Sequence, residues 1–96
     1  MNAAIRATET ETVTVGQGIT VSIGGDRYPA TIVWVSESGK TFRFQHDISK
    51  GSVFVMNPNA KVETAYRNKN GDWRLQGSSS HFIHVGRREY RMDPSF

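Results

Sequence analysis

Short stretches of alternating apolar and polar residues, separated by turns that contain glycine, run through most of this chain. In ITVSI, the alternation places Ile19, Val21 and Ile23 on one face, because successive side chains of a strand point to opposite faces. Turn residues interrupt the alternation about every 8 to 12 residues, which is the spacing of strands in small all-β domains. No stretch has the period of an amphipathic helix. The pattern therefore predicts an all-β protein, either a small barrel or a sandwich.

The turn signals set the bounds of the predicted strands. We expect strands at residues 19–23, 30–36, 41–46, 52–56, 62–67, 73–76, 82–85 and 89–92, the last two paired around Gly86, with connections at residues 24–26, 37–40, 47–51, 57–59, 68–72 and 77–80. Pro29 has no backbone N–H, so it is expected at the start of its strand or on an edge. The alternating TETETVT at residues 8–14 is interpreted as an edge strand or as a tail that passes into a strand.

The aromatic residues of the second hairpin are assigned mainly to the core. Period two places Ile32 and Trp34 on one face of the first strand of this hairpin. It places Phe42, Phe44 and His46 on one face of the returning strand. Aromatic and β-branched pairs across neighbouring strands stabilise a sheet by roughly 0.2 to 1 kcal/mol each. These residues are therefore expected to form an aromatic-rich core inside the sheet.

The size and composition predict one domain without disulfides. The chain has 96 residues, of which 36% are hydrophobic and 22% charged, and a chain of this length can bury one modest core. We expect residues 1–12 to be a flexible tail and residues 13–96 to form a single domain. The absence of cysteine favours a reducing compartment, the cytoplasm. No apolar run is as long as a signal peptide or a membrane span requires, so a membrane partner is not expected.

Two segments, GQGITVSIGGDRYPATIVWV and TFRFQHD, resemble the opening strands of Tudor and related SH3-like barrels. Those barrels commonly have glycine before an alternating strand, then an aromatic residue, alanine and isoleucine with period two, and then an aromatic strand that closes on aspartate. The matching residues are Gly18, Tyr28, Ala30, Ile32, Phe42, Phe44 and Asp47. The resemblance implies a small, partly open SH3-like barrel of five to seven short antiparallel strands.

Most of the chain also resembles a group of short uncharacterised proteins of bacteria and bacteriophages. The shared stretches are DRYPATIV, SGKT, a hairpin with Asn-Gly before Trp, and a final segment like GRREYRMDPSF. The hairpin departs from the group, because AYRNKNGDW has two extra residues between Arg67 and Asn70. This resemblance implies a bacterial or phage origin and carries no established activity.

The net charge of +3 is concentrated in the last third of the chain, where residues 61–96 carry seven Lys and Arg against four Asp and Glu. Basic side chains beside aromatic ones can bind a phosphate backbone and stack on bases. The residues that form this predicted basic set are Arg67, Lys69, Arg74, Arg87, Arg88, Tyr90 and Arg91. The alternative is a solvated face, in which Trp73 and Tyr90 pack in the barrel and the arginines cover their rims.

Other sites are disfavoured by the sequence. An aromatic cage for a methylated cation would need Tyr28, Trp34, Phe42, Phe44 and Asp47 to converge, but period two assigns most of these rings to the core. His81 and His84 lie three residues apart, which puts them on opposite faces of a strand, so no metal site or cofactor is predicted. No nucleophile elbow, phosphate-binding glycine loop or HExxH segment is present, and no catalytic residue is predicted.

These observations predict a small non-enzymatic binding or accessory protein. Its candidate partner is a nucleic acid, bound by the predicted basic set. The alternative is a protein partner or a second copy of the chain, contacted through exposed sheet edges. Residues 8–14 are the expected edge for such strand addition.

Overall fold

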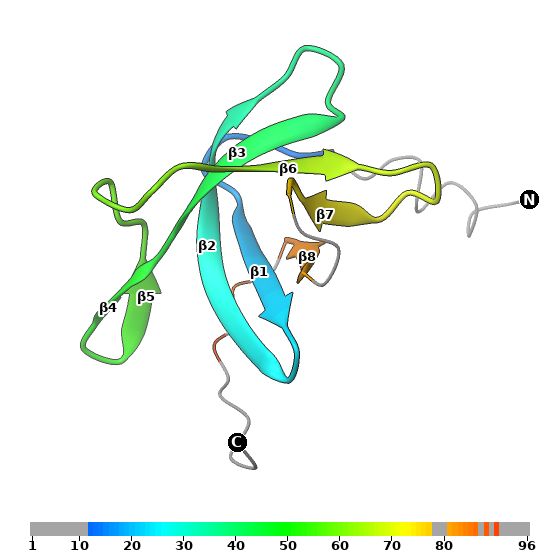
Figure 1. The fold of residues 1–96 in the computed structure, drawn as a ribbon. Coiled ribbons are helices and arrows are strands. Elements are labelled where there is room, and N and C mark those ends of the chain that lie inside the picture. The colour runs from blue at the N-terminus through cyan, green and yellow to red at the C-terminus, as the bar shows by residue number, and fades with distance from the viewer. Residues whose placement is uncertain (1–11, 78–80, 87, 89, 91–96) are drawn as a thin grey trace, which may run out of the picture.

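The computed structural model describes residues 12–77, 81–86, 88 and 90. Its strands are β1 (Gly18–Ile23), β2 (Asp26–Val35), β3 (Thr41–His46), β4 (Ile48–Lys50), β5 (Val53–Val55), β6 (Glu63–Arg67), β7 (Trp73–Leu75) and β8 (His81–Val85). The antiparallel strands β1-β2-β3-β6-β7-β8 form a closed barrel, and β4-β5 form a separate sheet (Figure 1). The prediction of a small all-β barrel, consistent with an SH3-like fold, is confirmed. The barrel was expected to be partly open. It is closed, because β8 pairs with both β7 and β1.

The core fills the barrel with the side chains that alternation places on the inner face. The most deeply buried members are Ile19, Val21, Ala30, Ile32, Phe42, Phe44 and Ala65, with Trp73 and Ile83 beside them. The Phe42 ring lies 4.7 Å from the Trp73 ring and 6.1 Å from the Phe44 ring, measured between centroids. Rings at these separations gain attraction beyond the burial of their area. The aromatic core predicted for Phe42 and Phe44 is therefore present.

Trp34 is the exception, and its predicted place in the core is wrong. The pairing of β2 with β3 shifts between Ile32 and Trp34, so Trp34 lies opposite Arg43 and Val35 lies opposite Phe42. The extra residue of such a bulge reverses the alternation beyond it. Trp34 is consequently 42% exposed, while Val35 packs against the core.

Pro29 lies inside β2 and not at its start. The strand begins at Asp26, directly after the two-residue Gly24-Gly25 turn, where Gly24 has a φ of 62° that glycine adopts without steric cost. The Pro29 carbonyl accepts a hydrogen bond from the Asp47 N–H, beyond the end of β3. In a strand, the N–H and the carbonyl of one residue point toward the same neighbouring strand. The N–H that Pro29 lacks would therefore also point toward the β3 side, at a level where β3 has already ended. Proline is therefore tolerated at this position.

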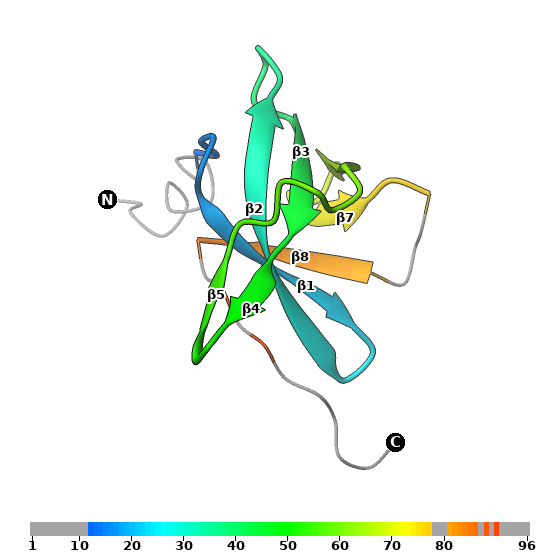
Figure 2. The ribbon, with the colours of Figure 1, turned by 90° about the vertical axis from the view of Figure 1, so that its left-hand side faces the viewer.

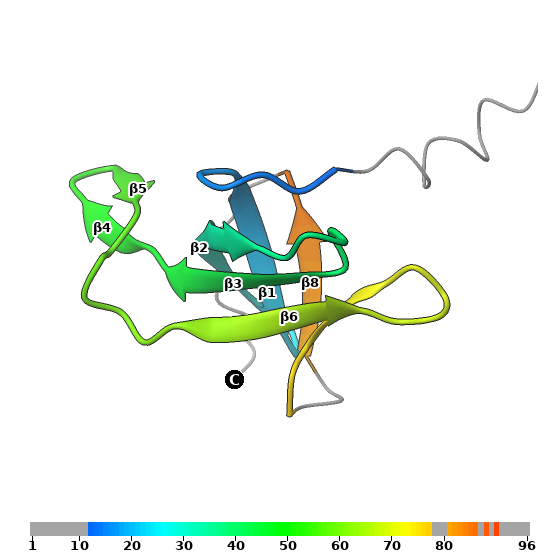
Figure 3. The ribbon, with the colours of Figure 1, turned by 90° about the horizontal axis from the view of Figure 1, so that it is seen from above.

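Residues 47–51, predicted as a loop, contain the strand β4. It pairs with β5 and forms a short hairpin that projects away from the barrel (Figures 1 and 3). Ser49 and Lys50 precede the turn, and Gly51 has a φ of 65° within it. The sequence missed β4 because ISK is too short to show an alternating pattern.

The two ends of the chain were only partly predicted. Val13 is buried in the core, although residues 12–14 are not in a strand; residues 8–11 lie outside the described part. The predicted pairing of residues 82–85 with 89–92 is not the pairing of β8, which lies between β7 and β1 (Figure 2). Tyr90, the described member of residues 89–92, is not in a strand. Among the described residues there is no helix of the length and apolarity that crossing a membrane requires.

Candidate functional site

The outer wall of the barrel carries a basic-aromatic band, defined as Trp34, Arg43, Tyr66, Arg74 and Phe82. Strand register brings these residues together, because cross-strand partners place their side chains on the same face. Trp34 of β2 is paired with Arg43 of β3. Tyr66 of β6 is paired with Arg74 of β7, which is in turn paired with Phe82 of β8. The two groups are joined because Arg43 is paired with Thr64, two residues before Tyr66 on the same face of β6.

The aromatic members of the band are open to solvent and two of them are covered by arginine. Trp34 and Tyr66 are each 42% exposed and Phe82 is 45% exposed. The Arg43 guanidinium carbon lies 4.6 Å from the centre of the Trp34 ring, and that of Arg74 lies 4.3 Å from the centre of the Phe82 ring. Such cation–π contacts place a positive charge directly over an aromatic ring, and guanidinium groups and rings both offer planar surfaces on which another ring can stack.

The band wraps around the wall, since its strands follow one another around the barrel (Figure 1). Its five residues include two arginines and no acidic residue. A single strand of nucleic acid is flexible and can follow such a curved wall. A duplex has a persistence length of about 150 base pairs and resists bending around a small barrel. The shape and charge of the band therefore suit an extended polyanion with exposed rings.

The predicted basic set does not form one surface. Arg67, Lys69 and Arg74 belong to the β6–β7 hairpin, and the Arg67 guanidinium carbon lies 5.8 Å from the centre of the buried Trp73 ring. Arg88 and Tyr90 lie beside β2, Asp47 and β5 instead. Arg87 and Arg91 lie outside the described residues. Arg74 is the one described member of the set that belongs to the basic-aromatic band.

The register of the hairpin with two extra residues is now defined. Arg67 is paired with Trp73, and the Asn68 side-chain oxygen accepts hydrogen bonds from the Asn70 and Asp72 N–H groups. The Arg67 side chain donates to the Gly71 carbonyl at 3.2 Å. The added residues are thus absorbed in a closed turn, and the Arg74 side chain stays on the outer wall.

Arg88 is held by a buried carboxylate. Its Nε donates to Asp47 Oδ2 at 2.9 Å, and its Nη2 donates to Thr31 Oγ1 at 2.8 Å. Thr31 Oγ1 in turn donates to Asp47 Oδ1 at 2.7 Å, and the Asp47 side chain has no exposed surface. Gly18 leaves room for Arg88, because a Cβ at Gly18 would lie 2.7 Å from Arg88 Cγ. These contacts fasten Arg88 to β2 and to the residue that follows β3.

The residues proposed for an aromatic cage do not converge. Phe42 and Phe44 are in the core and Trp34 is on the outer wall. Tyr28 and Asp47 instead line a mostly apolar hollow of about 390 Å³, here called the tyrosine pocket, whose other residues are Ile23, Pro29, His46, Phe54 and Tyr90. Desolvation, followed by the hydrogen bond to Asp26, raises the pKa of the Tyr28 hydroxyl. The Asp47 carboxylate is already bound by Arg88 and Thr31, so the described residues that line this hollow offer a cation no free counter-charge.

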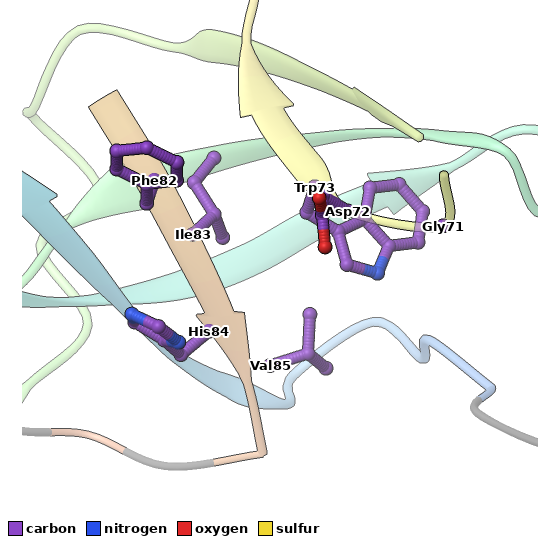
Figure 4. A pocket seen from close by; sticks show the side chains of 7 residues that line it. All are labelled: Gly71, Asp72, Trp73, Phe82, Ile83, His84 and Val85. Carbon is purple, nitrogen blue, oxygen red and sulfur yellow. The ribbon is translucent and has the colours of Figure 1, made fainter. Parts of the chain in front are cut away.

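A second hollow, here called the indole pocket, adjoins the band at Phe82. Its volume is about 340 Å³, and it is lined by Gly71, Asp72, Trp73, Phe82, Ile83, His84 and Val85. It lies where β7 begins at Trp73 while β8 continues past it to Val85, between the hairpin tip and the end of β8 (Figure 4). Its volume is at the lower end of the range for small-molecule sites, about 300 to 1,000 Å³.

The indole pocket contains a buried donor without a partner. Trp73 is 4% exposed, and its Nε1 has no hydrogen-bond acceptor among the described residues. An unpaired buried donor costs about 1 to 3 kcal/mol, so such groups are uncommon and need a reason. Figure 4 shows the indole nitrogen on the edge of the ring that is turned toward Val85, and the Asp72 and His84 side chains line the same pocket.

The histidines do not form a metal site in the described part of the chain, where no group of three or more His, Asp or Glu side chains could hold a metal ion. His81 and His84 both belong to β8. His46 Nε2 lies 3.2 Å from Glu63 Oε2, at the ends of β3 and β6. This contact joins neighbouring strands of the barrel.

Sequence reasoning did not include Trp34, Arg43 or Phe82 in the predicted basic set. Trp34 had been assigned to the core, and Arg43 was not singled out. The alternation of β8 puts the aromatic Phe82 on the same face as His84, which is a signal that the sequence contains. Its pairing with Arg74 is known only from the register of β7 and β8. Comparisons of the chain with protein-family models, curated proteins and solved structures found no match.

Proposed function

We propose that this protein is a small non-enzymatic module that binds single-stranded nucleic acid along the basic-aromatic band. The observation that carries the proposal is the register of β2, β3, β6, β7 and β8, which aligns exposed rings and guanidinium groups on one continuous strip of wall. Proteins that bind single strands without strong sequence preference combine these two elements, because cations neutralise phosphates and rings stack on bases. The cytoplasmic location and the bacterial or phage origin expected from the sequence are part of this proposal.

The test is fluorescence anisotropy of labelled mixed-sequence DNA and RNA single strands at several salt concentrations. Changing both Arg43 and Arg74 to alanine should weaken binding about tenfold near physiological salt. It should also lower the slope of log affinity against log salt by about 1.4, since each lost phosphate contact of a single strand contributes about 0.7. The salt slope identifies phosphate neutralisation directly.

A matched control removes the same charge elsewhere. Lys50 on β4 and Lys61 in the β5–β6 connection are both exposed and outside the band. Changing both to alanine should leave the slope and the affinity nearly unchanged. If the two double variants lose affinity equally, or if the unchanged protein binds no single strand, the band is not the binding surface.

A protein partner is the second candidate, favoured by the apolar surface of the β4–β5 hairpin. Ile48 and Val53 are 47% and 56% exposed, and Val55 and Met56 are also exposed. The hairpin stands outside the closed barrel, so its strand edges are not covered by the ring (Figure 3). Exposed apolar side chains on an uncapped strand pair favour contact with another chain.

This second candidate predicts self-association. Light scattering of the purified protein should give twice the chain mass of 10.8 kDa, and changing Ile48 and Val55 to lysine should restore the single mass. Deleting residues 1–12 tests the contact predicted for residues 8–14 in the same assay. A single mass for the unchanged protein at high concentration would exclude a dimer formed through either segment.

A further inference from the structure

The indole pocket offers a specific set of hydrogen-bonding groups next to the proposed nucleic-acid surface. An ionised aspartate only accepts hydrogen bonds and has two oxygens, whereas an indole only donates. The Asp72 side chain makes no hydrogen bond or ion pair with the described residues, although its N–H and carbonyl hold the turn through Asn68. The Trp73 side-chain N–H likewise has no acceptor in the described part of the chain. A ligand that satisfies both groups must present donors beside an acceptor.

A nucleobase has the size and planarity for this site, because single strands are recognised by bases that are turned out and stacked on aromatic rings. Phe82 belongs both to the band and to the pocket, so a strand that follows the band passes the mouth of the pocket. Among the bases, guanine presents two adjacent donors, N1–H and the N2 amino group, next to the O6 acceptor. Adenine has one amino donor beside a ring acceptor, and uracil flanks its single N–H with two carbonyl oxygens that a carboxylate repels.

We propose that the indole pocket is a guanine-selective subsite of the nucleic-acid interface. This inference rests on the proposed function. The Asp72 carboxylate accepts hydrogen bonds from N1–H and N2–H, and the Trp73 indole donates to O6. Phe82 and His84, which line the same pocket from β8, contact the plane of the base (Figure 4). Asp72 is only two positions before Arg74 of the basic-aromatic band, where a carboxylate would repel phosphate groups. A contact of Asp72 with the edge of a base, and not with the phosphate backbone, explains its presence there.

The experiment compares fluorescently labelled pentamers that differ at the central base. UUGUU, UUAUU and the inosine analogue UUIUU are titrated with the protein, together with the deoxy pair TTGTT and TTATT to separate RNA from DNA. The guanine pentamer should bind about tenfold more tightly than the adenine pentamer, in the range for one two-bond base contact. Inosine should fall between them, because it keeps N1–H and O6 but lacks the amino group.

Asp72→Asn is the decisive variant, since its side chain makes no contact that the fold requires and the substitution keeps its shape. It should remove the preference for guanine over adenine. Trp73→Phe, which keeps a ring in the core and removes the N–H, should reduce the preference for guanine and inosine alike. If Trp73→Phe does not fold, the Asp72→Asn comparison alone decides the proposal.

The outcomes separate this inference from the function on which it rests. If all pentamers bind equally and Asp72→Asn strengthens every one by the same factor, the aspartate acts only through its charge. The guanine subsite is then wrong, while the nucleic-acid function stands. If the unchanged protein binds none of the pentamers and no longer single strand, both proposals are wrong.

Discussion

Replacing Phe42 by alanine should remove a large share of the stability of this protein, whereas replacing Trp34 by alanine should change it little. Phe42 has no exposed surface and lies against Phe44 and Trp73. Truncating a buried phenylalanine costs about 3 to 5 kcal/mol, a large share of the roughly 5 to 15 kcal/mol that stabilises a domain. Trp34 lies outside the barrel wall, and its contact with Arg43 contributes about 0.5 to 1 kcal/mol.

The measurement is thermal and urea unfolding of both variants, followed by circular dichroism. The melting temperature of Phe42→Ala should fall by roughly 15 °C or more, because 1 kcal/mol corresponds to about 4 to 8 °C in a domain of this size. Phe42→Leu leaves a smaller cavity, so its melting temperature should lie between those of Phe42→Ala and the unchanged protein. Equal losses for the Phe42 and Trp34 variants would contradict the bulge in β2 and return Trp34 to the core.

Replacing Asp47 by alanine should lower the free energy of unfolding by about 2 to 3 kcal/mol, the second largest effect expected. Its buried carboxylate accepts hydrogen bonds from Thr31 and Arg88, and bonds to charged groups contribute about 1.5 to 3 kcal/mol each. The expected loss of unfolding free energy is smaller than the sum of the two bonds, because the Arg88 side chain is 37% exposed and solvent screens its charge. Urea unfolding measures this loss.

The Arg88→Ala variant completes a double-mutant cycle with Asp47→Ala. We expect about 1 kcal/mol for Arg88→Ala alone, because water reaches the uncovered carboxylate, and a coupling of about 1 kcal/mol between the two residues. Arg88→Ala should not weaken nucleic-acid binding in the folded protein. Additive losses of stability would show that Arg88 and Asp47 are not coupled. A loss of affinity without a loss of stability would show that Arg88 belongs to the binding surface, as predicted from the sequence.

The candidate site was harder to predict than the core, since its members are spread over five strands. The sequence drew attention to Arg74 because it lies in a basic segment beside aromatic residues. It provided no reason to group Arg43 with Tyr66 and Phe82, which are far apart along the chain and meet only through three strand pairings. Arg88 shows the opposite error, because a basic residue in the same segment is fixed by Asp47, 41 positions earlier.

The sequence by itself determined the all-β class, the inner positions of Ile19, Ile32, Phe42 and Phe44, and most of the turns. These depend on local rules: side chains alternate along a strand, and glycine and asparagine permit the backbone of tight turns. Only the tertiary structure decided the closure of the ring by β1 and β8 and the exposure of Trp34. Closure depends on the pairing of distant strands, and one extra residue in β2 reverses the alternation. The band and the indole pocket follow from that register, which no local pattern specifies.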